Sequence, residues 1–204
     1  MELILVRHGL PVRKENTVGP ADPELSVEGH AQAQHMANFL SIEHIDAIYS
    51  SPLKRAHQTG QPLAALKNLS ISLEPGVAEW DKDSNEYIPM EELKRANDPR
   101  WKEIMEGGWN SAEEPADFEE RVMESLEGIV NRHSGQTVVV TCHGGVINLY
   151  LSRVLGLPES RFFYPNYTSI HRIAASSKGH RSILSVNETS HLRGTGLPIG
   201  LFHS

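Results

Sequence analysis

Cysteine is almost absent from this chain of 204 residues, with Cys142 as its single example, so no intrachain disulfide can form. That scarcity is typical of proteins from the reducing cytosol, and we expect a cytoplasmic location. Long apolar runs are lacking as well, because the longest, around 137–151, is interrupted by His143 and Asn148 and is too short to span a bilayer. The first residues enter a strand-like segment at once, so we expect neither a signal peptide nor a membrane partner.

An excess of positive charge is also missing. The chain has 19 Lys and Arg residues against 26 Asp and Glu residues, a net charge of −7. General nucleic-acid binders need a positive field, so we expect no nucleic-acid partner, although a few converging cations could bind a small anion. The content of 39% hydrophobic and 22% charged residues predicts one folded domain over 1–204. Such a chain buries roughly 70% of its unfolded surface, so it needs no structural metal.

Strand-like and helix-like segments alternate along most of the chain. Apolar runs at 3–7, 45–49, 71–73 and 137–141 are typical of buried strands, and the helical patterns between and after them end near Leu40, Leu66, Val130 and Leu155. Two further β-like segments, at 168–175 and 180–187, are joined by Ser-Ser-Lys-Gly, which indicates a hairpin. This order predicts an α/β fold, a three-layer α/β/α sandwich around a mostly parallel central sheet, with the hairpin adding an antiparallel edge strand.

The stretch at about 76–112 has no sustained periodicity beyond a short helix near 90–96. It is charged and carries Trp80, Trp101 and Trp109. We interpret it as an insertion or lid over the site, because ligand contacts concentrate on such segments. Its tryptophans and Tyr87 are expected either to line a substrate pocket or to pack the lid itself.

Two segments share one pattern, in which an apolar strand ends and His-Gly follows at once, first at His8 and again at His143. Ligands of open α/β sheets bind beyond the carboxyl ends of the strands, so both histidines are expected at the same rim. The segment 50–59 places Arg55 in the first turn of a helix that begins at that rim. Helix N-termini and arginine side chains both bind phosphate groups well. We therefore predict that Arg7, His8, Arg55 and His143 converge on a bound phosphate group.

With these motifs the sequence resembles branch 1 of the histidine phosphatase superfamily, also called the phosphoglycerate mutase-like family. The resemblance rests on Leu5-Val-Arg-His-Gly9, on Ser50-Ser-Pro-Leu-x-Arg55-Ala-x-Gln-Thr59, on Glu79 and on Cys142-His-Gly-Gly-Val-Ile147. The motifs follow the family's order with suitable gaps over residues 1 to about 155. Each is weak alone, and their combination is highly specific.

The resemblance implies a role for each matched residue. His8 would be the nucleophile that forms a phosphohistidine intermediate, and Arg7, Arg55 and His143 would bind the phosphoryl oxygens. Glu79 would give a proton to the departing alcohol and then activate water. We therefore expect a metal-independent phosphomonoester hydrolase of the histidine acid phosphatase type, with a phosphorylated small molecule as substrate and no cofactor.

Further substrate contacts are predicted at Gly9, Gly144, Arg13 and Trp80. The two glycines would allow the backbone to approach a ligand closely. Arg13 would either extend the positive site toward a second substrate anion or remain a solvated loop charge. Asp81 and Asp83 lie near Glu79 and leave the identity of the acid open.

The chain departs from the family's mutases at two places where selectivity is set. Those mutases follow Arg-His-Gly with Glu or Gln and carry an Asn about six positions after the histidine, where this chain has Leu10 and Lys14. Their Gly-x-Trp-Glu-Gly segment after the acid is absent as well. These differences favour a phosphatase, with a phosphoglycerate mutase or a phospho-ligand binding protein of weak turnover as alternatives.

Three further features complete the prediction. No His-Glu-x-x-His and no Asp-x-His pattern lies near a strand end, so we predict no metal site. No Cys-x5-Arg loop follows Cys142, which is expected to be a buried, inert thiol. The apolar tail at 197–202 would pack either on its own domain or on the partner in a homodimer, which leaves the oligomeric state open.

Overall fold

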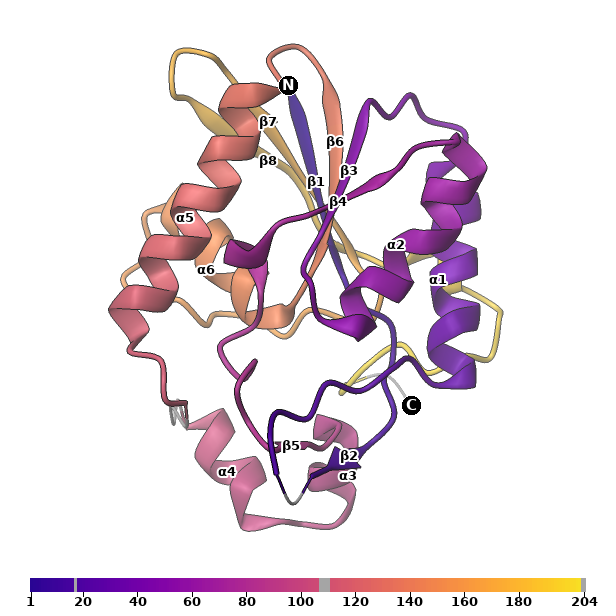
Figure 1. Cartoon of the computed structure of the whole chain (residues 1–204), viewed down its shortest axis with the longest axis vertical. Coiled ribbons are helices and arrows are strands. Elements are labelled where there is room, and N and C mark those ends of the chain that lie inside the picture. The colour runs from indigo at the N-terminus through magenta and orange to yellow at the C-terminus, as the bar shows by residue number, and fades with distance from the viewer. Residues whose placement is uncertain (17, 107–110, 203–204) are drawn as a thin grey trace.

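A six-stranded sheet forms the centre of the protein in the computed structural model, which describes residues 1–16, 18–106 and 111–202 (Figure 1). Its strands lie in the order β4 (Ile71–Leu73), β3 (Ala47–Ser50), β6 (Thr137–Cys142), β1 (Glu2–Arg7), β7 (Ile170–Ala175) and β8 (Arg181–Glu188). The first four run parallel, whereas β7 pairs antiparallel with β1 and β8 with β7. The predicted hairpin is confirmed, with Gly179 at a φ of +87° in its turn.

Helices cover both faces of this sheet (Figure 1). One face carries α1 (Val27–Leu40) and α2 (Lys54–Lys67), and the other carries α5 (Pro115–Arg132) and α6 (Gly144–Leu155). The central strands are apolar on both sides, since Ile4 and Val139 pack toward α1 and α2 while Leu3 and Val138 pack toward α5 and α6. A sheet of this kind needs cover on both faces, and the predicted three-layer α/β/α sandwich is confirmed.

Local sequence signals explain where these helices begin and which side they bury. Ser26 caps α1, its Oγ accepting the Gly29 N–H at 3.0 Å. Pro115 occupies the first turn of α5, where its missing N–H costs nothing. The apolar stripe of α5 is buried as its spacing predicts, at Phe118, Val122, Leu126, Ile129 and Val130. Within the described ranges, no helix combines the length and the apolarity that crossing a bilayer requires.

A smaller group of elements lies beyond the carboxyl ends of the parallel strands, at the lower end of Figure 1. It consists of β2 (Lys14–Glu15), β5 (Glu86–Tyr87), α3 (Met90–Arg95) and α4 (Pro99–Met105), and the 3-10 turn η1 (Pro75–Val77) leads toward it. The predicted short helix near 90–96 is confirmed as α3. The sequence does not predict α4 or the antiparallel pair of β2 with β5, because a strand of 2 residues is too short to show a period.

The C-terminal tail returns across the domain toward the same end of the sheet. After the 3-10 turn η2 (Ser190–Leu192), the Pro198 carbonyl oxygen accepts from Gln32 Nε2 at 2.5 Å. The Ile199 carbonyl oxygen accepts the Tyr167 N–H at 2.8 Å, and Leu201 is buried. The described part of the tail therefore packs on its own domain.

Candidate active site

The two His-Gly segments meet at one edge of the sheet. β1 and β6 are neighbouring parallel strands that end in register, with Arg7 opposite Cys142. His8 and His143 follow directly, and the His8 N–H donates to the Cys142 carbonyl oxygen at 3.0 Å. Both imidazoles are buried, with ring centroids 5.2 Å apart. Adjacent strand ends thus place the two side chains together, as the sequence pattern predicts.

His8 is held by the backbone of the next residue. Its Nδ1 lies 2.8 Å from the Gly9 carbonyl oxygen, which can only accept, so Nδ1 carries the proton and Nε2 keeps its lone pair. His8 lines a cavity, and no residue in the described part of the chain hydrogen-bonds to Nε2. Burial and the positive charges of Arg7 and Arg55 lower the pKa of His8 well below its ordinary value. The side chain is therefore a neutral imidazole, the form that a nucleophile needs.

Arg7, the last residue of β1, is enclosed by aromatic side chains. Its guanidinium carbon lies 5.0 Å from the ring centre of Tyr164 and 4.4 Å from that of Tyr167. Its Nη1 donates to the Pro165 carbonyl oxygen at 2.5 Å. Stacking and hydrogen bonding together hold the planar group in one orientation beside His8.

Arg55 lies in the first turn of α2 and is only 1% exposed. Its Nη2 donates to Asp81 Oδ1 at 3.0 Å, and its guanidinium carbon lies 4.6 Å from the ring centre of Tyr87. Arginine stays charged in proteins, so Arg7 and Arg55 bring two positive charges to a neutral His8. The two guanidinium groups therefore place positive charge beside His8, and Asp81 balances part of it.

His143 lies behind His8 and does not form part of the cavity wall. Its Nε2 lies 2.8 Å from Ser51 Oγ, which also accepts the Leu53 N–H at 3.2 Å. Among the described residues the Ser51 hydroxyl proton has no acceptor other than Nε2, so Nδ1 carries the proton of the imidazole. Burial and the charge of Arg55 lower the pKa of His143 well below its ordinary value. His143 is therefore a neutral donor through Nδ1.

Three nitrogens around His8 are buried donors without a hydrogen-bond partner. They are Arg7 Nε, Arg55 Nε and His143 Nδ1, three of the six unpartnered buried side-chain atoms in the ranges that the structure describes. A buried donor left unpaired costs about 1–3 kcal/mol, and proteins pair nearly all such groups. Three of them around one imidazole indicate a ligand with several acceptor oxygens.

Glu79 reaches the same cavity from the loop after η1. Its Oε2 accepts the Gly145 N–H at 2.8 Å and its Oε1 accepts the Trp80 N–H at 3.2 Å, which holds the carboxyl group against the start of α6. Burial, and secondly the negative charge of Asp81, raise the pKa of Glu79 to about 7. A carboxyl group with that pKa holds a proton in mildly acidic solution, as a general acid must.

The glycines of the two motifs serve packing in different ways. A Cβ at Gly145 would lie 2.3 Å from Glu79 Oε1, so only glycine lets the carboxyl group reach the backbone there. A Cβ at Gly9 would lie 2.7 Å from the Gly29 carbonyl oxygen, so Gly9 lets the loop after β1 approach α1. Gly144 lines the cavity and has open space beside it, the nearest atom being Arg7 Nε at 3.9 Å.

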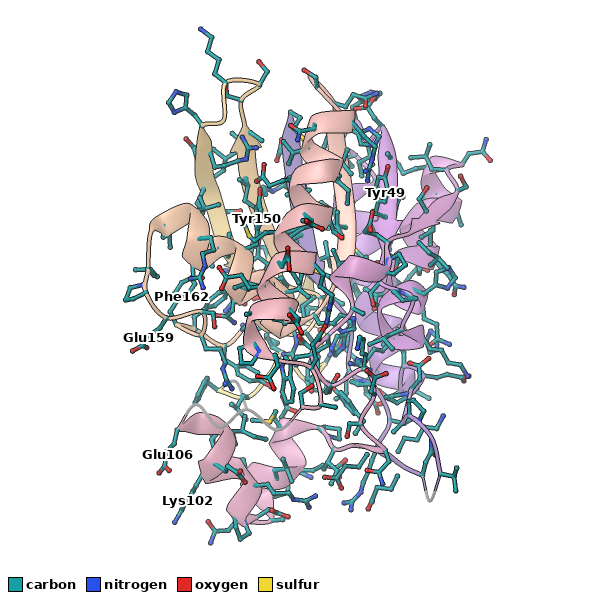
Figure 2. All side chains as sticks on the ribbon, turned by 60° about the vertical axis from the view of Figure 1, so that its left-hand side comes forward. Tyr49, Lys102, Glu106, Tyr150, Glu159 and Phe162 are labelled. Carbon is teal, nitrogen blue, oxygen red and sulfur yellow. The ribbon has the colours of Figure 1, made fainter. Side chains whose placement is uncertain are left out.

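The cavity has a volume of about 460 Å³, which is the size of a small-molecule site. Its wall combines Arg7, His8, Arg55 and Glu79 with side chains from 80–104, from the loop at 161–165 and from the tail at Phe202. Figure 2 shows Phe162 on the loop that follows α6, above α4 in that view, with Lys102 and Glu106 pointing away from the protein. Among the described residues, no group of three or more His, Cys, Asp or Glu side chains is arranged to hold a metal ion.

The other residues singled out in the sequence occupy different places. Trp80 lines the cavity. The Gly9 N–H donates to Thr59 Oγ1 at 2.9 Å, and Gly9 lies outside the cavity wall. Arg13 is also outside it, half-exposed and paired with Glu15 at 2.6 Å, because the β2 loop turns its side chain to the surface. Tyr87 lines the cavity whereas Trp101 does not, and Trp109 falls outside the described residues.

Cys142 is fully buried, as expected, and burial raises the pKa of its thiol, which keeps it protonated and inert. The sequence analysis does not identify Ser51, Tyr164 or Phe202. The run of three aromatic residues at 162–164 was the available signal for the wall after α6. Ser51 and Phe202 carry no signal of their own, because their partners lie far away in the chain.

Comparison with known proteins agrees with this geometry. The model of the histidine phosphatase superfamily (branch 1) matches residues 3–189. Phosphoserine phosphatase 1 of Hydrogenobacter thermophilus is 35% identical over 205 aligned residues, which cover 94% of each chain. A probable phosphoglycerate mutase of Yersinia enterocolitica is 27% identical over 78% of this chain and 76% of its own.

A solved structure shares the fold over most of its length. A mutant phosphoserine phosphatase of Entamoeba histolytica, in complex with phosphoserine, superposes with a TM-score of 0.73 at 26% identity, covering 94% of this chain and 98% of that one. The family match extends over nearly the whole chain, and the matched motifs meet at one cavity. The chain therefore belongs to branch 1 of the histidine phosphatase superfamily, as an enzyme of the phosphatase or phosphoglycerate mutase-like kind.

Proposed function

We propose that this protein is a phosphomonoester hydrolase that works through a phosphohistidine at His8 Nε2 and needs no metal ion. The observation that carries the proposal is the set of three unpartnered donors, on Arg7, Arg55 and His143, around a neutral His8. In this proposal the oxygens of a phosphoryl group on His8 accept from all three donors, including His143 Nδ1, which lies outside the cavity wall in the free protein. The site would then satisfy its buried polar groups only when substrate is bound.

In the first step, His8 Nε2 attacks phosphorus, and a P–N bond forms while the P–O bond to the alcohol breaks. Arg7, Arg55 and His143 donate to the non-bridging oxygens, whose charge is redistributed in the transition state. Protonated Glu79 gives its proton to the alcohol oxygen as it departs. The free alcohol leaves, and the phosphoryl group remains on His8.

In the second step, water attacks the phosphorus of phosphohistidine and the P–N bond breaks. Glu79, now a carboxylate, accepts a proton from that water. Inorganic phosphate leaves, and His8 and Glu79 return to their starting forms. One carboxyl group thus serves both halves of the reaction, which is why its raised pKa supports this role.

The pH dependence that follows is of the acid phosphatase type. The first step needs neutral His8 and protonated Glu79. Activity on alkyl phosphates should be high in mildly acidic solution and fall as the pH rises through about 7, where Glu79 loses its proton. On the acidic side it should fall only where His8 becomes protonated, well below the ordinary pKa of histidine.

A phosphoglycerate mutase is the alternative, in which the phosphoryl group returns to a second hydroxyl instead of to water. Two of the positions where the chain departs from the family's mutases, Leu10 and Lys14, lie outside the cavity wall, whereas the segment that replaces the mutases' Gly-x-Trp-Glu-Gly lines it. Lys14 Nζ donates to the Asp22 carbonyl oxygen at 3.1 Å, so it is engaged within the β2 loop. Leu10 and Lys14 thus support hydrolysis, because neither side chain reaches the cavity to hold a product for retransfer.

The test is hydrolysis of p-nitrophenyl phosphate and a panel of phosphorylated metabolites in the presence of EDTA. The native protein is compared with His8→Ala, and exposed His180 supplies the control variant His180→Ala. We expect activity that survives EDTA, disappears in His8→Ala and persists in His180→Ala. Rapid quenching with labelled substrate should trap a label that is stable in alkali and labile in acid, as phosphohistidine is.

Other results would contradict distinct parts of the proposal. Activity retained by His8→Ala would exclude the histidine mechanism, and loss of activity with EDTA would exclude metal independence. Exchange of the phosphoryl group between the 2- and 3-positions of phosphoglycerate, faster than phosphate release, would favour the mutase. Tight binding of phosphate esters without turnover would show that the protein is a phospho-ligand binding protein.

A further inference from the structure

The cavity continues past the phosphoryl-binding residues along a mainly apolar wall. We define the apolar wall as Ile88, Met90, Leu93, Ile104, Phe162 and Phe202. Two of its rings are open to solvent in the free protein, Phe202 at 61% and Phe162 at 40% exposure. Exposed aromatic surface inside a concave site is unusual unless a ligand covers it.

The apolar wall is held in place by contacts between segments far apart in the chain. Lys94 of α3 donates from Nζ to the Leu201 carbonyl oxygen at 3.2 Å, and the same Nζ lies 5.0 Å from the ring centre of Phe202. The Phe202 ring meets Tyr164 edge to face, with centroids 6.2 Å apart. Tyr164 in turn stacks on Arg7. The tail is thereby attached both to α3 and to the phosphoryl-binding end of the cavity.

The loop after α6 supplies the other exposed ring. Phe162 contacts Phe163 with ring centroids 4.9 Å apart, and the N–H groups of both residues donate to Asn148 Oδ1, at 3.1 and 3.3 Å. Asn148 lies on α6 and is buried, so it fixes this loop to the helix that follows His143. These bonds hold in place the loop that carries Phe162, which is labelled in Figure 2.

The charged groups of the cavity beyond Arg7 and Glu79 are largely paired with one another. Arg100 Nη1 donates to both Glu86 carboxylate oxygens, at 2.9 and 3.0 Å, and Arg100 also pairs with Asp98 at 2.8 Å. Asp81 accepts from Arg55, and Arg161 is engaged in a contact of its own. A carboxylate group on a substrate would have to displace one of the carboxylates that already pair with these arginines, whereas an apolar group would not.

We infer that the natural substrate is a phosphomonoester of an apolar alcohol, whose hydrocarbon part lies against Phe162 and Phe202. The inference rests on the proposed function for the phosphoryl end of the cavity. The carboxylate group of phosphoserine, named with the relatives above, is poorly matched to this wall. Phe162 and Phe202 are specificity-determining residues that touch the alcohol and leave the reaction itself unchanged.

The first experiment measures kcat/KM for n-alkyl phosphates from ethyl to hexyl, with phosphoserine and 3-phosphoglycerate alongside. The leaving alcohols of these esters have nearly equal acidity. A longer chain therefore changes the contact of the alkyl group with the apolar wall and little else. Each methylene group buried against the wall should raise kcat/KM about two- to fourfold. A flat alkyl series, or phosphoserine turned over faster than hexyl phosphate, overturns the inference.

Variants then locate the contact. Phe202→Ala and Phe162→Ala should both lower the dependence of kcat/KM on chain length, and Phe202→Leu should restore most of that dependence. Leu184 of β8 is 58% exposed and outside the cavity, so Leu184→Ala is the matched control. An unchanged slope in both phenylalanine variants contradicts the assignment. Selective loss of phosphoserine turnover in Arg161→Ala would instead show that the wall binds a substrate carboxylate.

Binding of alkylphosphonates separates this inference from the proposed function. These compounds keep the alkyl chain and the phosphoryl oxygens but cannot be hydrolysed. Calorimetry with ethyl- to hexylphosphonate should show affinity rising about two- to fourfold per methylene group, whether or not the protein turns over any ester. If the protein hydrolyses no ester but its affinity for phosphonates rises with chain length, only the proposed function is contradicted. If the affinity does not change with chain length, the inference is contradicted.

Discussion

The phosphoryl end of the cavity and the apolar wall differ in how the chain supplies their side chains. Arg7, His8 and His143 come from the ends of two neighbouring parallel strands, and Arg55 from the first turn of a helix that begins at the same edge. The backbone of the sheet determines the positions of all four. Hydrogen bonds and stacking contacts then determine their orientation.

The apolar wall comes from short or irregular segments. Leu93 lies on α3 and Ile104 on α4, which contain 6 and 7 residues. Phe162 lies on a loop, and Phe202 in the C-terminal tail. Such segments can change in sequence without moving the sheet. We therefore expect the reaction to depend on the regular core, and the selection of the alcohol to depend on segments that the core only supports.

The largest effect should come from Arg55→Ala, which removes a buried cation that we propose binds the phosphoryl group and leaves Asp81 without its partner. We expect kcat/KM to fall about 100- to 1000-fold on every ester, whatever its alcohol. Lys54→Ala, an exposed residue one position earlier, is the control and should change little. Circular dichroism checks that the variant is folded. A loss of kcat/KM that differs between alcohols would contradict the separate roles of the phosphoryl-binding residues and the apolar wall.

Glu79→Gln should separate esters by the acidity of the leaving alcohol and not by its shape. We expect a loss of about 100-fold on alkyl phosphates and less than about tenfold on p-nitrophenyl phosphate, whose leaving group needs little protonation. In the native protein the kcat/KM of alkyl phosphates should fall as the pH rises through about 7, because deprotonated Glu79 cannot act as the acid.

The decrease in kcat/KM of alkyl phosphates as the pH rises through about 7 should be absent in Glu79→Gln, because glutamine has no proton to lose in that range. Exposed Glu28 supplies the matched variant Glu28→Gln, which should keep the native pH profile. Equal losses of Glu79→Gln on alkyl and p-nitrophenyl phosphates would remove Glu79 from the role of acid and direct attention to Asp81.

Two neighbouring glycines offer a finer test of the same end of the cavity. In Gly145→Ala the new methyl group would meet the Glu79 carboxyl group and Trp80, so the acid must move. We expect kcat/KM for alkyl phosphates to fall about tenfold without a matching loss of thermal stability, because alanine favours the helix. Gly144→Ala has open space and should retain more activity. The opposite order would contradict the position assigned to Glu79.

The smallest effect is expected from Ser51→Ala, which acts through His143. Losing the Ser51 hydroxyl frees His143 Nε2 to hold the proton, so Nδ1 donates to the phosphoryl group less often. A single neutral hydrogen bond contributes about 1 kcal/mol, which is about a fivefold loss in kcat/KM. The loss should be equal for all esters. Ser72→Ala, at an exposed position on β4, is the control, and an effect of Ser51→Ala that varies with alkyl chain length would contradict this role.

The three-layer fold could be predicted because long strands and helices have periodic sequence patterns. These patterns involve residues only a few positions apart, as in the apolar runs of β1 and β6 and the apolar stripe of α5. The pair of β2 with β5 and the helix α4 could not be predicted, because their stability comes from tertiary contacts. One such contact is that of Glu86 with Arg100.

The site shows the same division. His8 and His143 could be assigned to one rim because each follows a strand directly. Arg13 has the same charge as Arg7 and lies close to it in sequence, yet it pairs with Glu15 at the surface. Charge alone did not distinguish Arg7 from Arg13. The path of the loop after β1 did.

Local sequence patterns decide which chemical groups reach the edge of the sheet, since the ends of strands and the starts of helices depend on those patterns. Tertiary structure decided their chemical state. His8 is neutral and Glu79 holds a proton near pH 7 because burial and neighbouring charges, contributed by distant segments, shift their pKa values. It also decided that Phe162 and Phe202 share one cavity, because no local pattern links residues 40 positions apart.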